Sequence, residues 1–168
     1  MSADRWADAE HVLCVRLDAL GDVLMTTPAI RAVKESRPGR HVTLLTSPAG
    51  AAAAALVPDV DDVIVYDAPW MKATARRANS RPDLAMIDRL RDEHFDAAVV
   101  FTVHSQNPLP PALTCYLADV PLRLAHCREN PYQLLTDWVP DPEPQQVTRH
   151  EVRRQLDLVA AVGCRTRD

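Results

Sequence analysis

The segment L-D-A-L-G-D-V-L-M-T-T-P-A, residues 17–29, holds the closest grouping of side chains that could do chemistry. Gly21 would allow the backbone to turn sharply as it leaves a strand. Asp22 then falls at the start of a helix, where a carboxylate meets free N–H groups and the positive end of the helix dipole. We expect Asp22 to be ionised at neutral pH and able to accept a proton from a substrate hydroxyl. Thr26 adds a hydroxyl about one turn later.

Asp22 also has a purely structural interpretation. Aspartate is a common residue at helix N-termini, because its side-chain oxygen accepts a hydrogen bond from a backbone N–H that has no partner within the helix. Capping alone would explain the residue type at this position without any catalysis. The residue types therefore leave two hypotheses open, a helix cap and a general base.

Polar side chains at the ends of other predicted strands supply further candidates. In an open parallel sheet, ligands bind beyond the carboxyl ends of the strands. Arg128 suits an anionic group, since a guanidinium binds phosphate or carboxylate in a fork, although a salt bridge between loop and helix would explain it equally well. The candidates for ligand binding are Asp18, Gly21, Thr26, Thr102, His104, Ser105, His126 and Arg128.

An alternation of strand and helix patterns would position these residues. The alternation predicts an α/β, Rossmann-like domain with a mostly parallel sheet flanked by helices. Strands are expected at residues 11–17, 41–46, 62–66, 96–101 and 120–125, and helices at 22–34, 49–56, 84–94, 110–118 and 149–162. The remaining divisions are a polar tail over 1–10, a surface loop over 67–82, a long loop over 126–148 and the start of a linker over 164–168, so that the domain covers 11–163.

The composition excludes several classes of protein. The 168 residues are enough for one domain with a single core. A net charge of −4 disfavours nucleic acid as a partner. The four glycines lie too far apart for a glycine-rich phosphate loop. Neither the four cysteines nor Asp59 and Asp61 have the placement of metal ligands, so we expect no metal and no cofactor.

The sequence also indicates a compartment. No run approaches the ~20 apolar residues of a membrane span, and residues 1–10 lack the pattern of a signal peptide. Four cysteines without a pairing pattern fit reduced thiols. We expect a cytoplasmic protein with at most a peripheral contact at the inner face of the cytoplasmic membrane. Trp70 and Met71 beside Lys72 would form an amphipathic patch for that contact.

The same residues carry a resemblance to a known family. The run V-R-L-D-A-L-G-D-V-L-M-T-T-P-A-I-R-A-V-K, residues 15–34, resembles the opening of glycosyltransferase family 9, the lipopolysaccharide heptosyltransferase family. The likeness continues through residues 43–48, 61–67, 121–130 and 149–163. It therefore covers nearly the whole chain from His11 onward.

The resemblance implies both an architecture and an activity. Such enzymes have the GT-B architecture of two Rossmann-like halves, and this chain is similar to the N-terminal, acceptor-side half. The aspartate of the family's G-D motif falls on Asp22, which would be the catalytic base. The substrates would be a nucleotide-sugar donor such as ADP-heptose and a lipopolysaccharide-core or glycolipid acceptor. The donor is held largely by the C-terminal half, so that half, or a separate subunit, would be a partner of this chain.

Two further functions are consistent with parts of the pattern. A chain with only the acceptor side could be a non-catalytic fragment or one subunit of a split glycosyltransferase, acting as a binding module. A phospho-receiver would also place acidic and hydroxyl groups such as Asp18, Asp22, Asp67 and Thr102 at strand ends. The fifth strand supplies Arg123 but no lysine, which disfavours the receiver.

Overall fold

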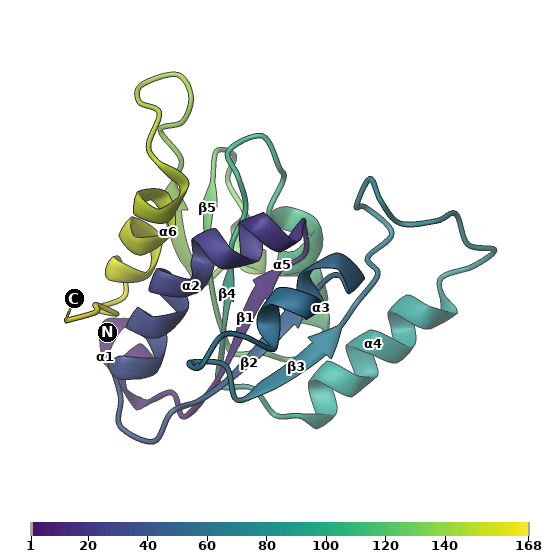
Figure 1. Cartoon of the computed structure of the whole chain (residues 1–168), viewed down its shortest axis with the longest axis horizontal. Helices are drawn as coiled ribbons and strands as arrows, with labels where there is room; N and C mark the ends of the chain where they lie inside the picture. The colour runs from purple at the N-terminus through teal and green to yellow at the C-terminus, as the bar shows by residue number, and fades with distance from the viewer. Residues whose placement is uncertain (1, 168) are drawn as a thin grey trace.

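The computed structural model describes residues 2–167, which form a six-stranded parallel sheet with helices on both faces (Figure 1). The strands run in the order β3-β2-β1-β4-β5-β6. They are β1 (His11–Arg16), β2 (His41–Thr46), β3 (Asp62–Val65), β4 (Ala97–Val100), β5 (Leu122–Cys127) and β6 (Asp137–Pro140). The helices are α1 (Ser2–Asp8), α2 (Leu20–Glu35), α3 (Pro48–Ala54), α4 (Arg81–Asp92), α5 (Leu109–Leu117) and α6 (Glu151–Ala160), with a short 3-10 helix, η1, at Tyr132–Leu134.

Burial on both faces explains why the central strands are nearly continuous apolar runs. Side chains of successive strand residues point to opposite faces. Val12 and Cys14 of β1 belong to one buried cluster, which takes in residues of α1, α2, α3 and α6. Leu13 and Val15 belong to the other, which takes in residues of α4 and α5. The predicted fold class, an α/β Rossmann-like domain with a parallel sheet, is confirmed.

The fifth strand begins two residues later than predicted, at Leu122. Asp119 has a φ of 57°, and the Val120 N–H is used by the preceding helix, where it donates to the carbonyl of Cys115. Pro121 has no N–H to offer a sheet. The strand also ends two residues later than predicted, at Cys127, so His126 lies within the strand rather than in the loop beyond it.

The expected polar tail over residues 1–10 is wrong, because residues 2–8 form α1. Trp6 is buried in the core, and its indole Nε1–H donates to Asp137 Oδ2 of β6 at 2.9 Å. The buried guanidinium of Arg40 donates to the Trp6 carbonyl at 2.6 Å. One aromatic residue therefore ties an otherwise polar segment to the domain.

The expected long loop over 126–148 contains β6, which pairs in parallel with β5. β6 is an edge strand of four residues, where Pro140 is tolerated because a sheet edge does not need every N–H. Residues 164–166 also pack on the domain, since Cys164 is buried and Thr166 donates to Glu35 Oε2 at 3.1 Å. Among residues 2–167, no helix is long and apolar enough to cross a membrane.

The role of α1 gives a stability test. Trp6→Ala is expected to lower the free energy of unfolding by about 3–5 kcal/mol, because it removes a large core side chain and leaves a cavity. Trp138→Ala is the matched control, because Trp138 is partly exposed on β6 and its loss should cost clearly less. Urea unfolding followed by circular dichroism measures both. Equal costs for the two variants would show that α1 is not part of the core.

Candidate functional site

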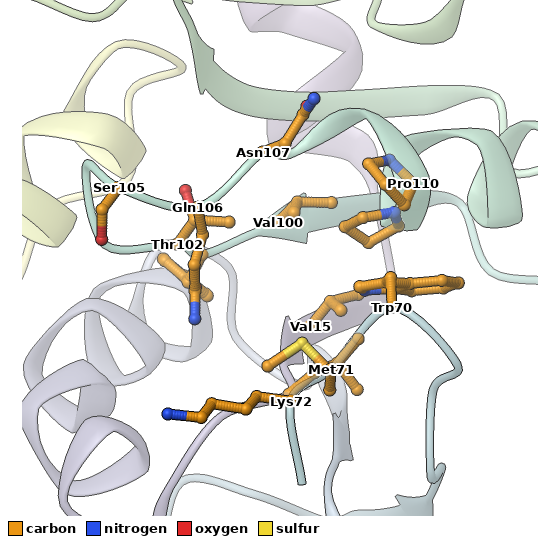
Figure 2. A pocket seen from close by; sticks show the side chains of 13 residues that line it. Val15, Trp70, Met71, Lys72, Val100, Thr102, Ser105, Gln106, Asn107 and Pro110 are labelled. Atoms are coloured by element: carbon orange, nitrogen blue, oxygen red, sulfur yellow. The ribbon is translucent and has the colours of Figure 1, made fainter. Parts of the chain in front are cut away.

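The carboxyl edge of the sheet opens between β1 and β4. From β1 the chain enters α2 on one face, whereas from β4 it passes through residues 101–108 into α5 on the other face. Ligands of doubly wound folds bind at such a switch point. A pocket of about 350 Å³ lies there, at the ends of β1 and β4 (Figure 2).

A buried guanidinium, that of Arg16, organises the end of β1. Its Nε and Nη2 donate to the two carboxylate oxygens of Asp18 at 2.6 and 3.0 Å. Its Nη1 donates to Glu151 Oε1 of α6 at 2.7 Å. Burial lowers the pKa of Arg16, but the hydrogen bonds and charges of Asp18 and Glu151 outweigh burial and hold that pKa above its ordinary value.

Of the three carboxylates around Arg16, Asp22 is the most exposed and the farthest from the guanidinium. Its Oδ1 lies 3.6 Å from Arg16 Nη2, and its Oδ2 accepts the backbone N–H of Ala19 at 3.0 Å. The side chain is 33% exposed, compared with 11% for Asp18 and 19% for Glu151. Asp22 therefore combines a fixed position with an oxygen that a ligand can reach.

Asp22 lies in the first turn of α2, three residues after the N-cap, which is Ala19. An alanine side chain offers no acceptor, so the Asp22 carboxylate reaching back to the Ala19 N–H supplies the reciprocal half of a capping box. The helix therefore begins at Leu20, two residues earlier than expected, and Asp22 supports its N-terminus from the third helical position rather than as the N-cap. This contact occupies one of its two oxygens and leaves the other beside Arg16.

Two neighbours of Asp22 differ from the sequence-based expectation. Gly21 lies within α2 and has no left-handed φ, so the predicted sharp turn at this glycine is wrong. A side chain added at Gly21 would meet nothing within 4 Å. The Thr26 hydroxyl is buried and donates to the Asp22 carbonyl at 2.7 Å, which is the usual back-bond of a helical threonine. Thr26 therefore supports the helix rather than facing a ligand.

The pocket at the switch point is apolar on one side and polar on the other. Trp70 lies next to Pro110 (Figure 2). The Trp70 ring packs edge-on against Tyr66, with the ring centroids 5.8 Å apart. The side chains of Lys72 and Gln106 extend to the same side of the pocket, away from Trp70 (Figure 2). The polar members of the lining are Lys72, Thr102, Ser105, Gln106 and Asn107.

A second pocket, of about 270 Å³, brings His104, Ser105, His126 and Arg128 together. Arg128 donates from Nε and Nη2 to the Glu143 carbonyl at 3.0 and 2.8 Å, and also to the His104 carbonyl. These bonds hold two loops together and commit part of the guanidinium that the sequence assigned to an anion. Ser105 is shared by both pockets, which makes them neighbours along the edge of the sheet.

His126 is buried and has one hydrogen-bonding partner. Its Nε2 lies 3.2 Å from the Arg154 carbonyl, and its Nδ1 has no partner within residues 2–167. Burial lowers the pKa of His126, and the positive charge of Arg154 lowers it further. The imidazole is therefore held in its neutral form.

Helix α6 contributes a set of site residues that the sequence did not single out. Arg154 is buried, donates to the Thr102 carbonyl at 2.9 Å and forms a two-pronged ion pair with Asp141 at 2.9 and 3.1 Å. Gln155 donates to the same carbonyl at 2.9 Å and to Glu151 at 2.7 Å. Arg16 of β1 was also not singled out. It is the one charged residue in the apolar run H-V-L-C-V-R-L, and that position could have marked it as a buried cation that needs partners. The α6 residues had no such signal, because charged side chains on a helix are usually solvated.

The carboxylates at this edge are paired with a cation of the chain itself. Within the part of the chain that the structure describes, residues 2–167, no group of three or more histidine, cysteine, aspartate or glutamate side chains is placed to hold an ion. The carboxylates at the end of β1 are instead engaged by Arg16. These side chains can take part in proton transfer and in the binding of polar or anionic groups.

The neutral state of His126 gives a pH test. Below about pH 6.5, the ordinary pKa of histidine, the unfolded chain takes up a proton that the folded chain resists, because its pKa is lowered. The stability contributed by neutral His126 is therefore present above that pH and lost as the pH falls through it. His126→Gln should flatten the fall in melting temperature between pH 7.5 and pH 5.5.

His94→Asn is the control for that test, because His94 is exposed and has a φ of 55°, which asparagine tolerates. This variant should keep the slope of the parent chain in differential scanning fluorimetry. A His126→Gln protein with the parent's full pH dependence would show that His126 is not the group responsible.

Comparison with known proteins identifies a shared fold. No protein-family model and no curated protein matches the sequence. A glycosyl transferase family 9 structure from Veillonella parvula DSM 2008 aligns with 92% of this chain at 15% identity and a TM-score of 0.67. The E. coli ADP-heptose lps heptosyltransferase II aligns with 89% of this chain at 21% identity and a TM-score of 0.65. The structure of E. coli heptosyltransferase WaaC in complex with ADP-2-deoxy-2-fluoro heptose aligns with 94% of this chain at 19% identity and a TM-score of 0.68.

This chain spans only part of those structures. The aligned region covers 41% of the Veillonella chain, 40% of heptosyltransferase II and 50% of WaaC. At such low identities the likeness establishes the fold and leaves substrates undecided. The chain thus has the α/β fold found over two-fifths to one-half of the length of glycosyltransferase family 9 and heptosyltransferase structures, as its resemblance in sequence led us to expect.

Proposed function

We propose that this chain is the acceptor-side half of a glycosyltransferase of the heptosyltransferase type, with Asp22 as the general base. The reaction would transfer a heptose or related sugar from a nucleotide-sugar donor to a lipopolysaccharide-core or similar glycan acceptor. The observation that carries the proposal is the position of the Asp22 carboxylate, which is partly exposed at the carboxyl edge of the sheet and fixed by Ala19 and Arg16.

The reaction would need a proton acceptor, a group that orients it and positive charge near the reacting groups. A hydroxyl of the acceptor must lose its proton as its oxygen attacks the anomeric carbon of the donor. The bond from that carbon to the nucleoside diphosphate breaks, and the diphosphate leaves with the electron pair. Asp22 would take the proton, since an ionised carboxylate within hydrogen-bond reach of a hydroxyl acts as a general base. The Arg16 guanidinium would keep that carboxylate oriented. The N-terminus of α2 adds a positive dipole end beside the reacting groups.

The two pockets would hold the acceptor. Trp70 offers an aromatic face to a sugar ring, and Lys72 and Gln106 offer donors to its polar groups. His104, Ser105 and Arg128 would bind a second part of the acceptor in the adjoining pocket. For the donor, the supporting observation is that WaaC has been solved with ADP and with an ADP-heptose analogue. We assign the donor, by analogy, to a second half outside this chain.

A non-catalytic binding module is the second candidate. The chain spans two-fifths to one-half of the length of its structural neighbours. Such a module would keep the acceptor pockets and have no use for a base at Asp22. The sequence that follows codon 168 discriminates the two candidates, because a glycosyltransferase requires a second Rossmann-like half.

Asp22→Asn tests the assignment of the base. In a fusion with the donor-binding half of a heptosyltransferase, turnover is expected to fall roughly 10²–10⁴-fold, because an amide cannot accept the proton. The asparagine oxygen can still accept the Ala19 N–H, so the free energy of unfolding should change by less than ~1 kcal/mol. Rate and stability are measured separately, by radiolabelled sugar transfer and by urea unfolding.

Asp18→Asn is the comparison for that variant, since Asp18 is paired with Arg16 and less exposed. It should lose less turnover and more stability than Asp22→Asn. Near-normal transfer by Asp22→Asn would identify Asp22 as a helix cap and remove it as the base.

The affinity of the isolated chain for nucleotide sugars tests whether the donor is bound by the other half. The isolated chain is expected to bind ADP- and UDP-sugars no more tightly than the millimolar range, about 4 kcal/mol of binding free energy or less. Isothermal titration calorimetry measures this directly. Micromolar binding of either nucleotide sugar would contradict the proposal that the donor is held elsewhere.

A further inference from the structure

The segment between β3 and α4 is strongly basic within an acidic chain. Residues 68–82 contain Lys72, Arg76, Arg77 and Arg81 and no acidic residue, whereas the chain as a whole has a net charge of −4. In Figure 1 this segment is the long teal loop that projects outward from the end of β3 before the chain enters α4. The positive charge is therefore concentrated at one projecting place.

Hydrogen bonds within the loop give it a defined conformation. They also engage Asp67 and Asp83, the acidic residues on either side of it. The Thr74 hydroxyl lies 2.8 Å from Asp67 Oδ1 and 2.6 Å from the Ala68 carbonyl oxygen, and its one proton is shared between these two acceptors. Arg77 turns inward and donates to Asp83 Oδ1 at 2.6 Å and to the Asp67 carbonyl at 2.7 Å. Tyr66 donates to the same Asp83 oxygen at 2.8 Å. Burial and this contact with Asp83 raise the pKa of Tyr66.

The other three cations of the loop are left for solvent. Lys72, Arg76 and Arg81 are exposed, and none of their side chains forms a hydrogen bond or ion pair with any of residues 2–167. Arg77, by contrast, already has its carboxylate partner. Three unneutralised positive charges within ten residues attract an anionic surface.

Apolar side chains accompany these cations. Leu84, in the first turn of α4, is 57% exposed and lies three residues beyond Arg81, on the same side of the helix. Trp70 and Met71 directly precede Lys72 and are half-buried, and the Trp70 ring packs edge-on against Tyr66. Cations interleaved with tryptophan, methionine and leucine are typical of a surface that lies at the interface of a lipid bilayer.

We propose that a basic loop face, made of Lys72, Arg76, Arg81 and Leu84 with Trp70 and Met71 at its base, binds the anionic headgroups of a membrane surface. The three cations supply attraction to the headgroups, which is worth a several-fold gain in binding for each basic side chain near the surface. The exposed leucine adds a contact that a purely polar polyanion would not use. The inference does not depend on the role proposed for Asp22. Trp70 and Lys72 belong both to this face and to the pocket that we assign to the acceptor.

Vesicle co-sedimentation tests the proposal on the chain itself. The chain should bind vesicles of mixed phosphatidylglycerol and phosphatidylcholine, bind vesicles of phosphatidylcholine alone much more weakly, and be released by salt. The triple variant K72Q/R76Q/R81Q should weaken binding to the anionic vesicles by about tenfold or more. All three side chains are exposed, so circular dichroism should show an unchanged fold.

The matched control is R5Q/R153Q/R165Q, which removes the same charge from exposed arginines outside the loop. It should bind as the parent does. The proposal is overturned if the parent does not bind anionic vesicles, if the loop triple binds as well as the parent, or if the control loses as much as the loop triple. Equal or tighter binding to a DNA duplex would overturn it in favour of a nucleic-acid surface.

Discussion

The buried guanidinium of Arg16 is the constraint on which the geometry of this edge depends. A charge without solvent must be neutralised and hydrogen-bonded, and losing one partner of a buried ion pair costs about 3–5 kcal/mol. Arg16 satisfies this need with Asp18 from the loop after β1 and Glu151 from α6, which lies 135 residues away along the chain. The end of β1, the start of α2 and the start of α6 are thereby fixed to one another. Asp22 owes its position to that arrangement.

The same helix supports the neighbouring strands through a second buried cation. Arg154 joins the end of β4, through the Thr102 carbonyl, to Asp141 just beyond β6. Burial raises the pKa of Asp141, but the hydrogen bonds and charge of Arg154 outweigh burial and lower it overall. Buried polar networks of this kind hold a single arrangement, because a broken member leaves an unsatisfied group in a medium of low dielectric. The rims of both pockets are therefore held by α6 as much as by the sheet.

Much of this fold was predictable because local pattern and burial agree. The apolar runs of β1, β2 and β4 and the alternation with helices follow directly from a parallel sheet covered on both faces. The sequence also predicted that Asp22 lies near the start of a helix. α1 and β6 were not, since Trp6 is one aromatic in a polar segment and β6 is a four-residue edge strand next to prolines. Their order comes from contacts with distant residues, which no local pattern reports.

The sequence predicts that the candidate residues gather at one edge of the sheet, but it does not predict the hydrogen bonds and ion pairs among them. In a parallel sheet, residues that follow the strands all lie at its carboxyl edge, where a topological rule places ligands. The rule does not reveal that Thr26 bonds back to its own helix, that Arg128 is committed to two carbonyls or that Glu151 reaches Arg16. Such pairings are decided by which donors lack partners after folding. They require the tertiary structure.

The central claim is that the Asp22 carboxylate lies where an acceptor hydroxyl must lose its proton. A crystal structure of this domain, fused to a donor-binding half and holding a donor analogue and an acceptor glycan, tests that claim most directly. The account predicts that the attacking hydroxyl lies about 2.6–3.2 Å from a carboxylate oxygen of Asp22, with the Arg16 contacts retained. An acceptor bound with its reactive hydroxyl out of reach of Asp22, and beside another base, would contradict it.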